Sequence, residues 1–117
     1  MTEVLVLIAS GPEDAPARAL EGLTQARAMF QIGMLDRVRV LLTGPGVGCI
    51  AESPEAEEHR EAVEELLADG VEVAACTKSL NSADLLDTAA GLPLLRPVGT
   101  PTYLSERARS GDTVVSF

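Results

Sequence analysis

Apolar and polar positions along this chain form two alternating patterns, and the first is a set of short apolar runs. These runs lie at residues 4–9, 38–43, 71–76, 92–98 and 112–117. The first run, VLVLIA, is apolar throughout, which is typical of a strand buried on both faces of a sheet. Pro93 and Pro97 interrupt the fourth run and indicate a short strand or an edge strand. The five runs therefore predict five strands.

The second pattern is helical and occupies the segments between the runs. Helices are predicted at residues 16–34, 54–69, 82–90 and 100–109. In the first segment Ala19, Leu23 and Ala26 recur at an interval that places them on one face of a helix. Ser53 and Pro54 supply an N-cap and a first-turn proline for the second helix. Residues 44–52, GPGVGCIAE, contain much Gly and Pro and predict an irregular loop.

Strands that alternate with helices predict an α/β fold with a parallel sheet. We expect residues 1–117 to form a single three-layer α/β/α domain, in which helices cover both faces of a five-stranded sheet in a flavodoxin-like layering. The alternation leaves the order of the strands in the sheet open.

Charge and cysteine content narrow the classes of partner. The formal net charge is −9, and much of the acid lies in residues 52–69, where it indicates a solvated helix face. This charge argues against nucleic acid and anionic membrane surfaces as partners. Two cysteines are too few for a disulfide scaffold, and neither a signal peptide nor a membrane-spanning run is visible. We therefore expect a cytoplasmic protein with reduced thiols.

A ligand of an open α/β sheet binds beyond the carboxyl ends of the strands. Cys76 ends the third predicted strand, and Lys78, the only lysine, follows two residues later. We take Cys76 and Lys78 as candidate catalytic residues. The candidate binding residues leave the same edge of the sheet and are Ser10, Gly11, Thr43, Gly44, Gly46, Gly48, Cys49, Ser79 and Thr100.

Two interpretations of Cys76 stay open. In the first it is a nucleophile, because Lys78 and a helix starting just beyond it would favour the thiolate. Residues 44–48 would then form a mobile rim over the thiol, since glycine has few steric limits. In the second, Cys76 is a small buried apolar residue. The surroundings of the thiol distinguish the two interpretations.

The remaining candidate groups favour structural roles. Cys49 either resolves a sulfenate or persulfide on Cys76 or anchors the loop as a small apolar residue, and we favour the anchor. His59, the only histidine, is predicted to be a partly buried packing residue of the second helix. The sequence GPGVG follows the second strand and departs from the dinucleotide-binding fingerprint, so we expect no phosphate site there. No cluster of metal ligands is visible, and we expect no metal and no cofactor.

The order of these motifs resembles the DsrE/DsrF-like family over nearly the whole chain. The resemblance rests on a first strand ending IASGPED, the small-residue loop, GVEVAAC, and YLSERARSGDTVVSF at the end. It implies a five-stranded parallel sheet, homotrimers or homohexamers, and, for some members, persulfide transfer on a cysteine that matches Cys76. Two features depart from the pattern: TKSLNSADLLD follows this cysteine, and Cys49 has no counterpart.

Three functions compete on this basis. The first is a sulfur carrier or sulfurtransferase-like protein that passes persulfide sulfur through Cys76 between donor and acceptor proteins. The second is a non-catalytic homo-oligomer that binds a small ligand or a protein in the same cleft. The third, flavin binding, is less favoured, because only Tyr103 and two Phe residues are available to stack on the ring.

Overall fold

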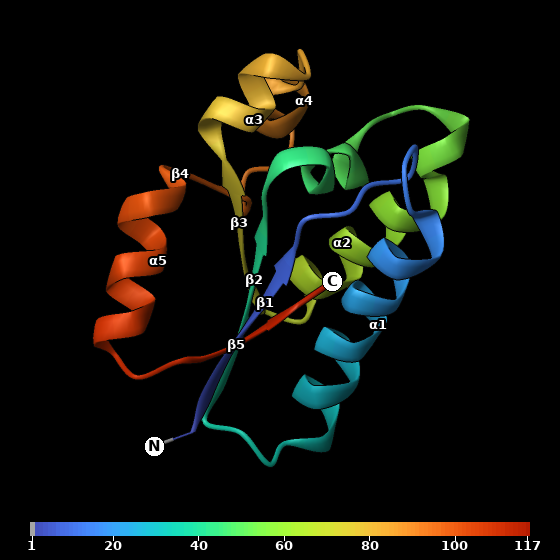
Figure 1. The fold of residues 1–117 in the computed structure, drawn as a ribbon. Helices are drawn as coiled ribbons and strands as arrows, with labels where there is room; N and C mark the ends of the chain where they lie inside the picture. The colour runs from blue at the N-terminus through green and yellow to red at the C-terminus, as the bar shows by residue number, and fades with distance from the viewer. Residues whose placement is uncertain (1) are drawn as a thin grey trace.

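The computed structural model describes residues 2–117 and contains five strands, two 3₁₀ helices and five α-helices (Figure 1). In chain order these elements are β1 (Glu3–Ile8), α1 (Pro16–Ile32), β2 (Arg37–Leu42), η1 (Gly44–Ile50), η2 (Pro54–Ala56), α2 (Glu57–Ala68), β3 (Glu72–Cys76), α3 (Thr77–Ser82), α4 (Leu86–Ala90), β4 (Arg96–Val98), α5 (Thr100–Arg109) and β5 (Thr113–Ser116).

The five strands form one parallel sheet in the order β4-β3-β2-β1-β5, which confirms the predicted α/β class and supplies the strand order. The strands β2, β3 and β4 are each added on the same side of the preceding strand. The chain then crosses back to place β5 beside β1. The predicted proline-rich strand is short and lies at an edge, since β4 comprises only Arg96–Val98.

Helices cover the two faces of the sheet unequally. In Figure 1, α1 and α2 lie on one face, α5 lies alone on the other, and α3 and α4 stand above the carboxyl edge. The face under α1 and α2 carries the larger apolar cluster, which includes Val6, Val40 and Val73. The α5 face carries a smaller cluster of Leu5, Leu41, Ala74 and Tyr103. The acidic positions of α2 are mostly exposed, as the sequence predicts.

The prediction of an irregular loop at residues 44–52 is wrong, because most of this segment forms the 3₁₀ helix η1. Proline at the start of a helix is tolerated, and Pro45 occupies that position here. The helix packs tightly on the end of β1: a Cβ atom added at Gly46 would lie 2.0 Å from the carbonyl oxygen of Ile8. Glycine therefore allows a close backbone approach at this point rather than a mobile rim.

The helix after Cys76 also differs from the prediction. A helix was predicted to begin at residue 82, whereas α3 begins at Thr77, directly after the strand. The chain then breaks at Asp84, which has a φ of 57° in the left-handed region, before α4 begins at Leu86. Asp is one of the few residues other than Gly that adopt this conformation at low cost. Local propensity therefore places the break after α3 rather than before it.

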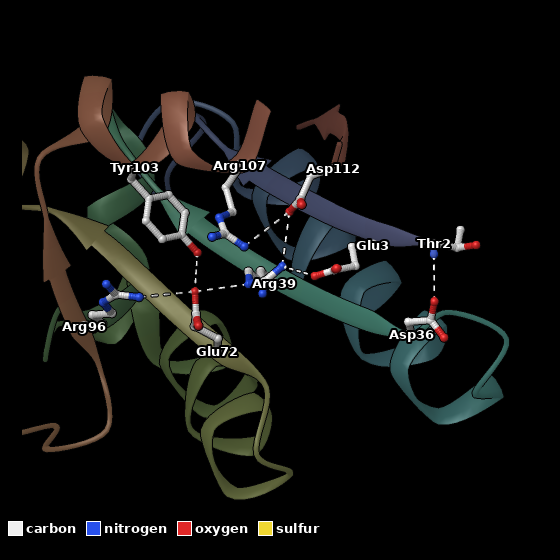
Figure 2. A network of polar contacts seen from close by, with 9 residues as sticks. All are labelled: Thr2, Glu3, Asp36, Arg39, Glu72, Arg96, Tyr103, Arg107 and Asp112. Carbon is white, nitrogen blue, oxygen red and sulfur yellow. Dashed lines mark hydrogen bonds and ion pairs between the residues drawn. The ribbon is translucent and has the colours of Figure 1, made fainter. Parts of the chain in front are cut away.

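Figure 2 shows a polar network on the α5 face, at the amino end of the strands. The guanidinium group of Arg39 lies 2.6 Å from a carboxylate oxygen of Glu3, 3.3 Å from Asp112 and 3.4 Å from Glu72. The hydroxyl of Tyr103 donates a hydrogen bond of 2.5 Å to Glu72. The hydrogen bond from Arg39 holds the pKa of Glu3 below its usual value. These contacts fix α5 and the start of β5 on the central strands.

Candidate functional site

Parallel pairing gathers the predicted site segments at the carboxyl edge of the sheet. Cys76 pairs with Val98 of β4, and on its other side Ala75 pairs with Leu42, the residue before Thr43. The Oγ1 atom of Thr43 lies 3.4 Å from the Oγ1 atom of Thr100, the first residue of α5. Segments that are far apart in the sequence thus meet around Cys76.

Cys76 lies at the junction of β3 and α3, where it serves as the N-cap residue of the helix. Side chains alternate between the two faces of a strand, so Cys76 lies on the same face as Ala74, beneath α5. The residue is 7% exposed. Its thiol makes no side-chain capping hydrogen bond to α3.

The Ser79 hydroxyl links η1 to Cys76. The backbone N–H of Gly44 donates a hydrogen bond of 2.9 Å to Oγ of Ser79. Because the hydroxyl oxygen accepts this bond, its own hydrogen stays available for the sulfur of Cys76. The helix η1 therefore orients the donor that faces the thiol.

These surroundings change the acidity of Cys76. Burial raises the pKa of the thiol, but the hydroxyls of Ser79, Thr100 and Thr43, together with the backbone amide of Ser79, outweigh burial and lower the pKa to about 6. Hydrogen bonds to a charged form favour that form. This arrangement therefore favours the thiolate, and the groups that favour it most are neutral donors.

Lys78 has a different position from the one that the sequence suggests. Its side chain is exposed on α3, and the main groups that lower the pKa of Cys76 are the hydroxyls of Ser79, Thr100 and Thr43 and the backbone amide of Ser79 rather than Lys78. Lys78 instead lines a shallow surface hollow between η1 and α3, which we call the Lys78 hollow, and Cys76 is not part of its lining. The residues around this hollow are Gly44, Pro45, Lys78, Ser79, Ser82 and Ala83.

Cys49 occupies the opposite environment. It lies in η1, is 0% exposed and belongs to the larger apolar cluster. Burial, reinforced by the nearby carboxylate of Asp14, raises the pKa of the Cys49 thiol to about 12. An uncharged thiol inside the core is a poor nucleophile, which fits the interpretation of Cys49 as the anchor of this segment.

The other predicted rim residues also pack closely. Ser10 is buried, and the backbone N–H of Gly11 donates a hydrogen bond of 2.6 Å to Oδ1 of Asp14. A Cβ atom added at Gly11 would lie 2.1 Å from the carbonyl oxygen of Pro45. Gly48 has more room, since its nearest contact would be Pro12 at 3.4 Å. The segment after β1 and η1 therefore form a fixed wall of the site.

Neither a histidine base nor a metal-binding group stands at this edge. His59 is buried, and its Nε2 atom lies 2.8 Å from the carbonyl oxygen of Pro16, which confirms the predicted packing role. Across residues 2–117 no group of three or more His, Cys, Asp or Glu side chains is placed to hold a metal ion. No helix in this part of the chain is long and apolar enough to cross a membrane.

The sequence located three hydroxyl residues at this edge without indicating that they act on the thiol. Thr43, Ser79 and Thr100 are predicted as binding residues, and in the structure they are also donors that lower the pKa of Cys76. The available signal was a hydroxyl residue at or just after the carboxyl ends of β2, β3 and β4, which are neighbours in the sheet. Without the strand order, the sequence does not show that these three hydroxyl residues lie close together.

Comparisons with known proteins agree with this fold. The model of the DsrE/DsrF-like family matches residues 3–117. The conserved protein of unknown function BT1422 from Bacteroides thetaiotaomicron has a similar structure, with a TM-score of 0.72, 14% identity, and coverage of 98% of this chain and 94% of that one.

Two further solved structures are similar. The YchN protein of E. coli matches with a TM-score of 0.72 and 20% identity, over 100% of this chain and 99% of that one. The protein of unknown function MTH1491 from Methanobacterium thermoautotrophicum matches with a TM-score of 0.69 and 21% identity, over 100% of both chains. At these identities the likeness shows a shared fold. No curated protein matches this chain.

Proposed function

This chain belongs to the DsrE/DsrF-like family, and we propose that it is a cysteine-based sulfur carrier that passes persulfide sulfur through Cys76. The observation that carries the proposal is the environment of this thiol. Four neutral donors lower its pKa to about 6 against the effect of burial. A cysteine that only fills the core is expected to have a pKa raised by burial, and Cys49 is such a residue.

The proposed chemistry consists of two exchange steps. The thiolate of Cys76 attacks the outer sulfur of a donor persulfide, an S–S bond forms at Cys76, and the donor leaves as a thiolate after its own S–S bond breaks. The thiolate of an acceptor then attacks the outer sulfur on Cys76 in the same way, and Cys76 returns to the thiolate. One sulfur atom moves in each step, with no net oxidation or reduction.

The lowered pKa suits both steps. Thiol exchange is fastest when the pKa of the attacking thiol lies near the ambient pH. With a pKa of about 6, roughly nine-tenths of Cys76 is thiolate at pH 7. The same donors would stabilise the persulfide anion and make Cys76 a better leaving group towards an acceptor. The shielded position, at 7% exposure, would limit loss of the sulfur to other thiols.

The proposal includes the surroundings of the protein. A relay between thiols needs a reducing compartment, so we propose a cytoplasmic location. A sulfur donor and an acceptor protein would be the partners.

We also propose homotrimers or homohexamers, because α5 alone covers its face of the sheet and the edge strand β5 is exposed, with Val114 45% and Val115 36% exposed. Sedimentation at micromolar concentration tests this assembly, and a monomer alone would contradict it.

A second function is favoured by one observation. A hollow between the segment after β1, η1 and the α3–α4 turn has a largely apolar lining, including Val47, Ala56 and Leu85, and the thiol is not part of it. A small ligand bound there would need no chemistry at Cys76. In that case the protein is a non-catalytic binding module, and Cys76 would load no sulfur.

Mass spectrometry after incubation with a persulfide donor tests the primary proposal. Trypsin cleaves after Arg39, Arg60 and Lys78, so residues 40–60 carry Cys49 and residues 61–78 carry Cys76 on separate peptides. We expect the mass of one added sulfur atom on the second peptide only. The Cys76→Ser variant should load nothing while it keeps its fold and assembly, and Cys49→Ala should load like the wild type. Wild-type protein that gains no sulfur on Cys76 would contradict the proposal.

A further inference from the structure

Lys78 is the only lysine in the chain, and the structure leaves its charge free. The side chain is exposed on α3, and no carboxylate among residues 2–117 lies within ion-pair distance of it. Most of the arginines, by contrast, are paired: Arg27, Arg39, Arg60, Arg96 and Arg107 all contact carboxylates. An unpaired cation at a hollow can interact with an incoming group.

The Lys78 hollow is linked to the thiol through Ser79, a donor to Cys76, although Cys76 itself does not line the hollow. Two of its residues, Gly44 and Ser79, form the hydrogen bond that orients the Ser79 hydroxyl towards Cys76. A small molecule in the hollow therefore lies directly beside a donor to the sulfur. Lys78 stands at the side of this approach, in the same helix as Ser79.

The charge around this approach is otherwise negative. The chain carries a formal net charge of −9, and the neighbouring hollow is lined by Glu13 and Asp14. Exposed charges act over about 8 Å at physiological ionic strength, so the charge nearest the hollow dominates there. Lys78 therefore makes a locally positive entrance on an acidic protein.

We propose that Lys78 selects the sulfur donor of Cys76 by charge, and that the donor class is a small persulfide carrying a carboxylate or another anionic group. This inference rests on the proposed sulfur transfer at Cys76. The ammonium group attracts the anionic part of the donor into the hollow, and the thiolate of Cys76 attacks the outer sulfur of the donor persulfide. The donor thiolate leaves, and Lys78 takes no part in bond formation.

A matched pair of thiol reagents tests the selection independently of sulfur chemistry. Iodoacetate is anionic, iodoacetamide is its neutral counterpart, and both alkylate the same sulfur. We expect Lys78→Met to lower the iodoacetate rate at Cys76 by about two- to fourfold at low ionic strength, the size expected for one solvent-exposed charge. The iodoacetamide rate and its pH profile should stay unchanged, because neutral donors set the acidity of the thiol.

Three controls give the result its meaning. Lys78→Arg keeps the charge and should keep the wild-type ratio of the two rates. Lys78→Glu reverses the charge and should lower the ratio further than Lys78→Met. Arg109→Met removes the same formal charge from the exposed far end of α5 and should leave the ratio unchanged. Added salt should bring the wild-type ratio towards that of Lys78→Met.

The outcomes separate this inference from the proposed function. Equal rate ratios in wild type and Lys78→Met would overturn charge selection even if Cys76 loads sulfur. A change in the iodoacetamide pH profile of Lys78→Met would also overturn it, because Lys78 would then act on the thiol itself. Sulfur loading that is faster from glutathione persulfide than from its esterified form, in wild type but not in Lys78→Met, would support both. A charge-dependent ratio without any sulfur loading would refute the transfer reaction and the donor class, and would leave Lys78 as a contact for an anionic ligand.

Discussion

Oγ of Ser79 accepts a hydrogen bond of 2.9 Å from the backbone N–H of Gly44, and this contact joins a 3₁₀ helix to the environment of the thiol. The same hydroxyl is the foremost of the donors that lower the pKa of Cys76. The Ser79 hydroxyl is thus held by Gly44 of η1 and acts as a donor to Cys76 at the end of β3. The packing of η1 thereby affects the chemistry of a residue that lies outside it.

Ser79→Ala should raise the pKa of Cys76. The substitution removes a donor that favours the thiolate, and we expect an upward change of about one pKa unit. The rate of iodoacetamide alkylation against pH gives the value. Ser82→Ala is the matched control, because Ser82 is exposed at the end of the same helix. An unchanged pKa in Ser79→Ala would show that the remaining donors suffice.

The two thiols should differ sharply in reactivity. The alkylation rate of Cys76 should rise with pH to a plateau with a midpoint near 6, since only the thiolate reacts. Cys49, with a pKa of about 12 and 0% exposure, should react only when the chain unfolds. Quantifying the tryptic peptides 40–60 and 61–78 over time distinguishes them. A midpoint for Cys76 at or above about 8.5 would contradict the proposed activation.

Gly46→Ala should destabilise the protein. The added Cβ atom would lie 2.0 Å from the carbonyl oxygen of Ile8, so η1 or the end of β1 must shift. We expect a loss of about 2–4 kcal/mol in the free energy of unfolding, as for strongly overpacked sites. Chemical denaturation at fixed protein concentration measures it.

Gly48→Ala supplies the control within the same helix. Its new Cβ atom would meet only Pro12, at 3.4 Å, which is an ordinary contact. The change in stability should stay within about 0.5 kcal/mol. If both variants lose the same stability, the close approach of Gly46 to Ile8 is not the cause.

Arg39→Met should weaken the attachment of α5 and β5. It leaves the carboxylates of Glu3, Glu72 and Asp112 without their shared partner. The expected loss is about 2–3 kcal/mol, less than for a fully buried pair because two of these carboxylates keep some exposure. Arg37→Met, two residues earlier on β2 and exposed, should change stability by less than about 0.5 kcal/mol.

The same substitution should change the response to acid. The pKa of Glu3 is lowered in the folded state by Arg39, so its stabilising contribution is present above the unfolded value of about 4.5 and is lost as the pH falls through the folded value. The free energy of unfolding of the wild type should therefore fall more steeply with acid in this range than that of Arg39→Met. Parallel pH profiles for the two proteins would remove the assigned role of the Arg39–Glu3 pair.

The sequence by itself determined the elements of this protein and the edge at which a site would lie. Apolar runs and helical spacing depend on neighbours within a few turns, so five strands and the helices at residues 16–34, 54–69 and 100–109 could be read closely. Cys76 follows from the same reasoning, because parallel strands place their carboxyl ends at one edge. Local signals failed where tertiary contacts matter: η1 packs so closely on the end of β1 that only glycine fits at Gly46 beside Ile8, and composition does not reveal such a contact.

Only the tertiary structure decided the strand order and, with it, the acidity of the thiol. Pairing β3 between β2 and β4 brings Thr43 and Thr100 to Cys76 from segments 33 and 24 positions away in the chain. Lys78, the nearest cation in sequence, points instead to the surface. Sequence distance was therefore a poor guide to electrostatics, because a hydrogen bond acts through the direction and spacing of two atoms, and long-range strand pairing sets both.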